Sequence, residues 1–337
     1  MGSVIPLKKE IDNSYIRLKN LVGHKLDDVT QRIKYKLASE INLIHKMTDY
    51  HVKSGGKRIR PLLTLASAKL CGYRNGNRDV NLAACIELIH NATLLHDDVI
   101  DNSDLRRGIK TANSVWGNQS SILVGDYLFS RCFEMMVEDG SEEILKLLSA
   151  TSSRIAQGEV LQLEHKGEID LLEETYFNII NMKTAALFAA ATKVGACLGN
   201  ISKKEKDALE SYGKNLGLAF QIADDALDYL SSNTIFGKEI GKDFYEGKTT
   251  LPLIIIYQRG NNEERSFLKT IFKKKKRNED DFSETLALIN KYKAVQASFK
   301  RAEYFVNISH DSLGIFQHSR EREILQNLTE FSLNRSF

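Results

Sequence analysis

Two groups of aspartates stand out because each lies inside an otherwise apolar stretch. The pattern Asp-Asp-x-x-Asp occurs at residues 97–101 and again at residues 224–228. On a helix the first and last Asp of each pattern share a face, and like charges at that spacing cost about 0.2–0.5 kcal/mol. Two such faces about 5 Å apart would repel by about 3 kcal/mol per charge pair at an effective dielectric constant of 20. The stability of the fold gives no reason for this repulsion between carboxylates, whereas binding of divalent cations between them does.

The ligand types favour magnesium. Mg²⁺ typically takes one or two carboxylates, several waters and the phosphates of a substrate, so two facing groups of carboxylates suit a diphosphate held between metal ions. Zinc is less favoured, because no His or Cys stands at ligand spacing within either pattern. A single copy would be better explained as a solvated acidic face. Two copies in apolar helices favour the metal site.

Cationic residues recur next to these patterns or next to glycines. They are Lys57, Arg58 and Arg60 after Gly55-Gly56, Arg106 and Arg107 beyond the first acidic pattern, and Lys183, Lys238 and Lys248. Cations beside a glycine pair at a helix start form a favourable anion site. Each of these residues alone would ordinarily be a surface charge. Together they predict two anionic groups, one bound through metal and one held directly by Arg and Lys.

The elements that must position these residues are predicted to be helices. Apolar residues recur at helical spacing over residues 62–70, 82–97, 122–137, 144–163, 176–198, 204–229 and 251–257. The breaks between them are short, as in antiparallel helical packing, and no alternating run is long enough for a sheet. We therefore expect an all-α fold, with residues 1–337 forming a single-domain antiparallel helical bundle. Residues 1–25 would be an N-terminal helical segment and residues 26–337 the core bundle.

Composition narrows the possible functions. The chain is 42% hydrophobic and 27% charged, as in a globular protein. Its net charge of +3 is too small to indicate nucleic-acid binding. The four cysteines form no CxxC pair, which predicts reduced, mostly buried thiols in a cytoplasmic protein. No apolar run is long enough to span a membrane, and we expect no export signal. The basic run 273–277 is followed by acids and is predicted to be a solvated loop between helices.

Longer motifs connect these features to a known family. The chain contains GGKRIRP, IELIHNATLLHDDVIDNSDLRRG, GDYLFSRCFEMM, GEVLQLE, KTAALF, FQIADDALDY and GKEIGKDFYEGKTTLP. From about residue 55 to 252 it resembles the trans-type polyprenyl diphosphate synthases, specifically the long-chain branch with octaprenyl, solanesyl and decaprenyl diphosphate synthases. The resemblance implies an isoprenoid synthase fold around a central cavity and a homodimer. It also implies repeated condensation of isopentenyl diphosphate with an allylic diphosphate, for which farnesyl diphosphate is the expected starter.

The resemblance also implies roles for individual residues. Two to three Mg²⁺ ions would be bound by Asp97, Asp101 and Asp224, supported by Asp98, Asp225 and Asp228. The allylic diphosphate would be contacted by Arg106, Lys183, Thr184, Gln221, Lys238 and Lys248. The diphosphate of isopentenyl diphosphate would be bound by Lys57, Arg60, His90 and Arg107. A lone His in an apolar helix is more often a core residue, but His90 lies two helical turns before Asp97, on roughly the same face.

The helix before the first acidic pattern is expected to set product length. Thr93 and Ala92 lie about 6 Å and about 7.5 Å below Asp97 along the helix axis. Short-chain members of the family carry aromatic rings at these positions. Small side chains there predict a deeper tunnel, with Phe133 and Met136 as part of its floor. The plainer alternative is that these residues only pack the core. A product of C40–C50 for quinone side chains is expected, with transient membrane-surface contact for its release.

Two other functions remain open. A terpene cyclase shares the ionisation chemistry, but it has no second diphosphate to hold, so the KRIR run and His90 argue against it. A non-catalytic subunit of a heteromeric prenyl synthase would be expected to have lost one acidic pattern or the Arg106-Arg107 pair, and the chain retains both.

Overall fold

A computed structural model of the chain describes residues 8–53, 55–106, 108–230, 240–331 and 333. The helices are α1 (Lys8–Val22), α2 (Lys25–Lys36), α3 (Asn42–Lys53), α4 (Ile59–Leu70), α5 (Arg78–Ile100), α6 (Ala112–Trp116), α7 (Asn118–Asp139), α8 (Glu142–Glu164), α9 (Glu173–Ile180) and α10 (Ala186–Cys197). They continue with α11 (Lys203–Leu227), α12 (Lys242–Glu246), α13 (Leu251–Arg259), α14 (Asn262–Phe272), α15 (Glu279–Lys291), α16 (Ala294–Ser312) and α17 (Arg320–Phe331). The all-helical prediction is confirmed.

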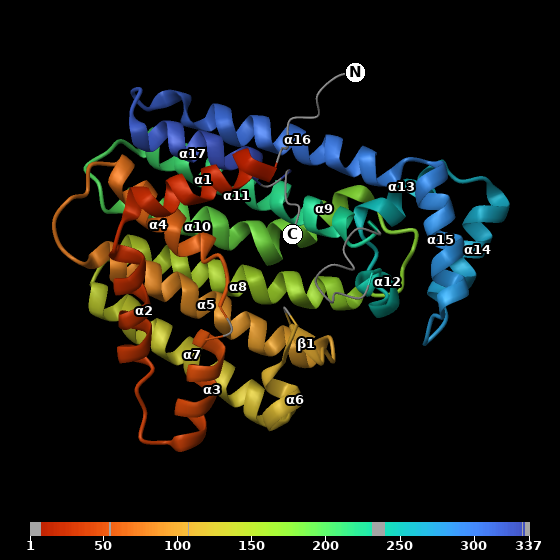
Figure 1. The fold of residues 1–337 in the computed structure, drawn as a ribbon, viewed down its shortest axis with the longest axis horizontal. Coiled ribbons are helices and arrows are strands. Elements are labelled where there is room, and N and C mark those ends of the chain that lie inside the picture. The colour runs from red at the N-terminus through yellow and green to blue at the C-terminus, as the bar shows by residue number, and fades with distance from the viewer. Residues whose placement is uncertain (1–7, 54, 107, 231–239, 332, 334–337) are drawn as a thin grey trace.

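The long helices lie side by side in layers (Figure 1). In the middle, α10 packs against α11, α4 and α8, while α11 also packs along α16 and α5 along α7. In the view of Figure 1, α16 and α17 form the upper edge, α3, α6 and α7 the lower edge, and α14 and α15 the far end. The two acidic patterns sit at the carboxyl ends of α5 and α11, within this arrangement.

Two buried apolar clusters hold the helices together. The first joins α4, α5, α7 and α10 through side chains such as Leu62, Leu88 and Phe188. The second joins helices α9, α11, α13, α14, α15 and α16, with Ile222 and Ile254 among its members. Helix α11 contributes side chains to both clusters. The second acidic pattern is anchored in the second cluster, to which Ile222, Ala226 and Tyr229 belong.

The predicted helix over residues 176–198 is interrupted. Between α9 and α10 the chain forms one π-helical turn, η1 (Asn181–Ala185). Glycines flank this turn on two sides: a Cβ on Gly158 of α8 would lie 2.7 Å from the Cβ of Met182, and one on Gly217 of α11 would lie 2.7 Å from the Cα of Ala185. Only glycine permits such close approach. π-Helical turns occur frequently at functional sites, and this one carries Lys183 and Thr184.

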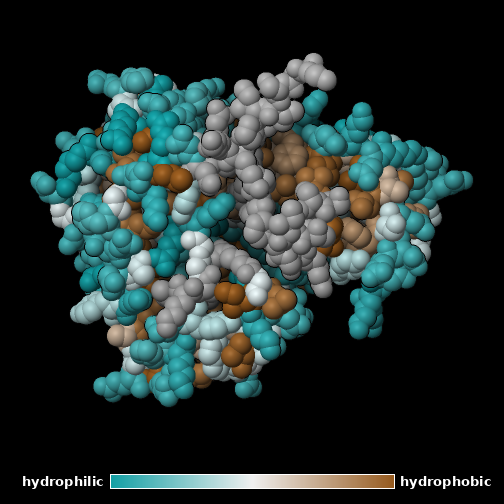
Figure 2. Space-filling view, viewed as in Figure 1, coloured by the Kyte–Doolittle hydropathy of each residue, from teal (hydrophilic) through white to brown (hydrophobic). Residues whose placement is uncertain are grey.

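The structure departs from a purely helical fold at one small hairpin. Strands β1 (Leu105–Arg106) and β2 (Ile109–Lys110) pair antiparallel just after the first acidic pattern. Figure 2 shows a largely hydrophilic face with apolar patches. Near the hairpin and α6, the exposed apolar side chains are Ile100, Leu105, Ile109 and Val115.

Three smaller predictions are confirmed. Residues 273–278 connect α14 to α15 as expected, and Lys274 pairs with Asp281 at 2.6 Å. All four cysteines are free thiols, with Cys71, Cys85 and Cys132 buried and Cys197 half-buried. In the described part of the chain, no helix is both long and apolar enough to cross a membrane.

The short helix η3 (Leu313–Ile315) links α16 to the segment before α17.

Candidate active site

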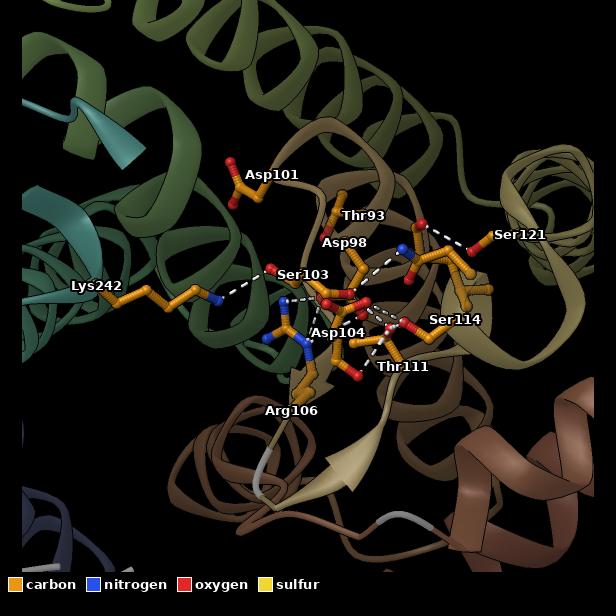
Figure 3. A network of polar contacts seen from close by, with 12 residues as sticks. Thr93, Asp98, Asp101, Ser103, Asp104, Arg106, Thr111, Ser114, Ser121 and Lys242 are labelled. Atoms are coloured by element: carbon orange, nitrogen blue, oxygen red, sulfur yellow. Dashed lines mark hydrogen bonds and ion pairs between the residues drawn. The ribbon is translucent and has the colours of Figure 1, made fainter. Parts of the chain in front are cut away.

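The first acidic pattern occupies the last turn of α5 and its end (Figure 3). The helix stops at Asp101, and Asn102 follows with a left-handed backbone (φ +49°). The hydroxyl of Thr111 donates to the carbonyl of Ser103 at 2.6 Å, which fixes the chain as it turns toward the hairpin. These local bonds hold the end of the helix and its carboxylates in place.

Asp98 and Arg106 form a two-point ion pair. The Asp98 carboxylate is almost fully buried, and its Oδ1 accepts from Arg106 Nε at 2.9 Å and Nη2 at 2.7 Å. Forked pairs of this kind are strong and geometrically specific. The hairpin therefore brings a cation back onto the acidic pattern that precedes it, and the Arg106 side chain remains about one-third exposed.

Asp97 lies near Lys183 and a second carboxylate. Burial raises the pKa of Asp97 to about 6, Lys183 opposes the shift, and Glu159 and Asp101 add to it. The Lys183 ammonium lies 2.5 Å from a carboxylate oxygen of Glu159 on α8 and donates to Gln162 at 2.7 Å. The π-helical turn thus presents its lysine to the first acidic pattern while α8 holds that lysine from the other side.

Asp101 joins the first pattern to the segment after α12. Its carboxylate accepts from Lys248 Nζ at 2.7 Å, and Lys248 also lies 2.8 Å from Glu246. Burial alone would raise the pKa of Asp101, but Lys248 lowers it below its usual value. For Lys248, nearby carboxylates including Asp243 and Asp101 outweigh burial and raise its pKa. This ion pair joins residues 147 apart in the sequence.

The second acidic pattern is held mainly by neutral donors. Asp225 is buried and accepts from the Tyr176 hydroxyl and from the Gln221 amide, each at 2.6 Å. The Thr184 hydroxyl donates to the Gln221 oxygen at 2.8 Å, so Thr184 and Gln221 bond to each other as well as lying near the acids. Burial raises the pKa of Asp225 well above its usual range, and Asp243 adds to the effect.

Asp243 is a further acid next to the second acidic pattern. The backbone N–H of Asp243, in α12, donates to Asp228 Oδ2 at 2.9 Å. Burial raises the pKa of Asp243 to about 6; Lys248 opposes the shift, while Glu246, Asp224 and Asp101 add to it. Carboxylates from α5, α11 and α12 therefore act on one another, and this mutual repulsion is what a divalent cation would relieve.

The donor set fits magnesium without forming a finished cage. Asp97, Asp101, Asp224 and Asp243 offer only oxygen atoms, which Mg²⁺ prefers. Across the described ranges, no group of three or more His, Cys, Asp or Glu side chains is placed to hold a metal ion alone. That fits an ion whose remaining ligands are waters and substrate phosphates.

The second cationic group lies at the start of α4. Arg58 caps the helix in a left-handed conformation (φ +47°). The Arg60 guanidinium lies 4.5 Å from the ring centre of Phe188, and the Lys57 ammonium 4.7 Å from that of Phe331. His90 is half-buried on α5, where its carbonyl accepts from the Thr93 hydroxyl at 2.8 Å. Arg107 and Lys238 lie outside the described residues.

The residues expected to set product length divide into two groups. Ala92 is fully buried, Thr93 is half-buried, and Met136 is buried in the same apolar cluster as Ala92. Phe133, in contrast, is 46% exposed on α7. Within the single chain, Phe133 therefore lies on the exposed face of α7, apart from the buried Met136, and its part in the floor stays a prediction. Its exposure follows from helical phase, because the buried face of α7 runs through residues 128, 132, 135 and 136.

Sequence reasoning gave no role to four residues that the structure brings to the site: Glu159, Tyr176, Asp243 and Glu246. Glu159 stands in GEVLQLE, and Asp243 and Glu246 stand in GKDFYEGK. These motifs marked the segments as functional, but nothing in the sequence singled out the acids within them. Tyr176 carried no sequence signal, since a tyrosine in an apolar stretch is ordinarily a core residue. A groove of about 670 Å³ lies elsewhere, lined by residues such as Phe177, Lys214 and Phe305, and contains none of the acidic patterns.

Comparisons with known proteins place the chain in a family. Residues 41–289 match the family described as Polyprenyl synthetase. The octaprenyl diphosphate synthase of Escherichia coli is 43% identical over 254 residues, which cover 75% of this chain and 78% of the relative. The crystal structure of a polyprenyl synthase from Caulobacter crescentus, in complex with calcium and isoprenyl diphosphate, superposes with a TM-score of 0.91 at 40% identity, covering 95% of this chain and 98% of the other. The crystal structure of a decaprenyl diphosphate synthase from Rhodobacter capsulatus superposes with a TM-score of 0.90 at 39% sequence identity, with the same coverage.

Proposed function

The chain belongs to the polyprenyl synthetase family and is a trans-polyprenyl diphosphate synthase, and from this premise we propose a magnesium-dependent reaction that makes long products. It condenses isopentenyl diphosphate repeatedly with an allylic diphosphate, for which farnesyl diphosphate is the proposed starter. The products are all-trans chains of C40–C50 destined for quinone side chains. The names of the octaprenyl and decaprenyl relatives support this length range.

One observation carries the proposal: acids from distant helices act on common cations. Lys248 pairs with Asp101 of the first pattern and also lies within the field of Asp243, whose backbone binds Asp228 of the second. Lys183 faces Asp97 in the same way. Carboxylates and ammonium groups that neutralise each other without substrate can exchange partners when metal ions and a diphosphate enter together.

Each charged group then has a role. Asp97, Asp101 and Asp224 hold two to three Mg²⁺ ions, and Asp98, Asp225 and Asp228 support them. Bound magnesium supplies neutralisation of the charge on the departing diphosphate. Lys183, Lys248, Arg106 and Lys238 contact the allylic diphosphate, with Thr184 and Gln221 beside them. Fixed cations aimed at charge that builds during bond breaking are the main source of such rate enhancement.

The second cationic group holds the other substrate. Lys57, Arg60, His90 and Arg107 bind the diphosphate of isopentenyl diphosphate and leave its double bond free to attack the allylic carbon. The C–O bond to the allylic diphosphate breaks, the new C–C bond forms, and a proton leaves to the departing diphosphate. The product is an allylic diphosphate longer by five carbons. No nucleophile from the protein is needed.

Product length depends on the small side chains below Asp97. Ala92 and Thr93 leave room on α5, and buried Met136 on α7 limits the depth. Ala92→Phe is expected to shorten the product sharply, and chromatography of the products checks this. Unchanged product length would reject the tunnel assignment.

The assembly proposed is a homodimer of single-domain subunits. Helices α7 and α8 carry several exposed apolar side chains, namely Leu123, Phe133, Val137, Val160 and Leu163. A second copy covering this face would bury them, which supports the dimer. The exposed apolar residues near the hairpin support transient contact with a membrane surface during product release. The cytoplasmic location stays a prediction.

Incubation of the purified protein with radiolabelled isopentenyl diphosphate and farnesyl diphosphate, with Mg²⁺ or with EDTA, tests the function. We expect label in long linear products only when Mg²⁺ is present. A cyclic hydrocarbon would favour a terpene cyclase, and no product would favour a non-catalytic subunit. Either outcome would overturn the proposal.

A further inference from the structure

Helices α1 and α17 both reach Lys57, which precedes α4. From α1, the hydroxyl of Tyr15 donates to the backbone carbonyl of Lys57 at 3.0 Å. From α17, the ring of Phe331 lies 4.7 Å from the Lys57 ammonium. The two rings stack on each other, with centres 6.0 Å apart and planes inclined by 21°. Tyr15 and Phe331 therefore form one aromatic support beneath a single lysine.

The lysine lies on a backbone of unusual conformation. It is exposed and follows Gly55 and Gly56, both with positive φ angles, and it precedes Arg58 in a left-handed conformation. An exposed lysine side chain loses much rotamer freedom when it binds an anion. Tyr15 restrains the backbone of the residue, and Phe331 restrains the end of its side chain.

The contact leaves the lysine able to bind an anion. An ammonium group has three N–H donors, and the face of an aromatic ring attracts the charge without accepting all of them. The ammonium can still donate to a diphosphate. The aromatic pair thus selects a side-chain position in advance, which raises affinity by lowering the ordering cost of binding.

We propose that Tyr15 and Phe331 are positioning residues for isopentenyl diphosphate, acting through Lys57. The inference rests on the proposed function, in which Lys57 binds that substrate. It assigns the two terminal helices a role in the affinity for one of the two substrates. The proposed contacts of the allylic diphosphate, which include Lys183 and Lys248, do not involve Lys57, so binding of that substrate is not expected to depend on Tyr15 or Phe331.

Packing alone would explain the stacked rings but not the hydroxyl. Helix α17 is also attached elsewhere: the buried Tyr212 hydroxyl on α11 donates to the carbonyl of Leu325 at 2.7 Å, and Arg17 pairs with Glu323 at 2.6 Å. Those contacts do not involve Lys57. They supply a matched control, because Tyr212→Phe removes one bond to α17 and leaves the aromatic support in place.

The test measures KM for each substrate and kcat in Phe331→Leu, Phe331→Tyr, Tyr15→Phe and Tyr212→Phe. We expect Phe331→Leu to raise KM for isopentenyl diphosphate about fivefold to tenfold, with kcat and the allylic KM within about twofold. Tyr15→Phe should raise the same KM about threefold. Phe331→Tyr keeps the ring and should restore the wild-type value. Calorimetric titration with isopentenyl diphosphate alone should show the same order of affinities.

Tyr212→Phe should lower the melting temperature without changing either KM. The inference is overturned if Phe331→Leu and Tyr15→Phe leave the KM for isopentenyl diphosphate unchanged, or if they raise both KM values equally. It is also overturned if Tyr212→Phe produces the same KM rise. If Phe331→Leu does not fold, Tyr15→Phe and Phe331→Tyr decide. A wild-type protein that fails to incorporate isopentenyl diphosphate would instead reject the proposed function.

Discussion

The two copies of Asp-Asp-x-x-Asp have the same residue pattern, but their described acids have different partners. In the first, Asp98 faces the guanidinium of Arg106 and Asp101 faces the ammonium of Lys248. In the second, Asp225 is held by the hydroxyl of Tyr176 and the amide of Gln221, which carry no charge. The pattern fixes where carboxylates stand on a helix. Their neighbours decide whether the negative charge is neutralised.

This difference separates two tasks. Ion-paired acids keep cations close to the place where a diphosphate would bind. In the described part of the chain, Asp225 is held by neutral donors, and Asp243 adds another carboxylate near it. A divalent cation would relieve the repulsion among the acids near Asp225, whereas Asp98 and Asp101 of the first pattern already share their charge with Arg106 and Lys248.

The largest expected effect tests whether both copies serve one metal cluster. Asp97→Ala and Asp224→Ala should each lower kcat about a thousandfold, because each removes a carboxylate that holds magnesium at the departing diphosphate. Single-turnover rates at saturating Mg²⁺ measure this. Asp104→Ala is the control, since exposed Asp104 accepts from Ser114 and lies outside the pattern. Its rate should stay within about threefold of wild type. A large effect at only one of the two acids would mean that the copies are not parts of one site.

The next prediction concerns the ion pair that distinguishes the first copy. Arg106→Ala leaves the Asp98 carboxylate buried without its cation, and should lower the free energy of unfolding by about 3 kcal/mol. Urea titration measures this value. As a control, Lys146→Ala breaks the exposed pair with Glu142. That change should alter the free energy of unfolding by less than about 1 kcal/mol. Equal effects in the two variants would show that Asp98 does not depend on its pairing.

Tyr176→Phe tests the neutral donors of the second copy. Asp225 would keep Gln221 and lose its hydroxyl partner, so stability should fall by about 1–2 kcal/mol, less than for Arg106→Ala. Because Asp225 adjoins Asp224, the Mg²⁺ concentration for half-maximal activity should rise about threefold to tenfold. Titration of activity with Mg²⁺ and a metal-dependent shift in melting temperature with inorganic pyrophosphate both measure the change. A stability loss with an unchanged metal requirement would limit Tyr176 to packing.

The smallest expected effect is a pH dependence shared by the two regions. Burial raises the pKa of both Asp97 and Asp243 to about 6 in the folded chain, above the usual value for aspartate. The folded state therefore binds these protons more tightly than the unfolded state does. In the metal-free protein, their contribution to stability should increase as the pH falls through about 6, and be lost again as the pH rises.

The measurement is the melting temperature in EDTA at pH 7.5 and pH 5.5. The double variant Asp97→Asn with Asp243→Asn removes both groups and controls for all others. We subtract the melting temperature at pH 7.5 from that at pH 5.5 in each protein. This difference should be about 2 °C more positive in the wild type than in the double variant. Identical pH dependence in both proteins would contradict the raised pKa values.

The sequence predicted what depends on neighbours along the chain. Helical periodicity placed both acidic patterns on helices, and glycine beside cations marked the start of α4. Contacts between distant segments could not be predicted in this way. The bond of Lys248 to Asp101 joins residues 147 apart, and the bond from Thr184 to Gln221 depends on the π-helical turn. Phe133 shows the same limit, because helical phase on α7 placed it outside the core.

The glycines that flank the π-helical turn have a consequence for variation in this protein. Gly158 and Gly217 carry no charge and touch no substrate in the proposed reaction. Yet one added methyl group at either position would meet the turn at 2.7 Å and force α8 or α11 away from it. Displacement of α8 would move Glu159 and Gln162 away from Lys183, and displacement of α11 would separate the turn from the aspartates of α11. Tolerance to substitution therefore does not follow distance from the charged residues, because a side chain at either glycine would displace a helix that positions them.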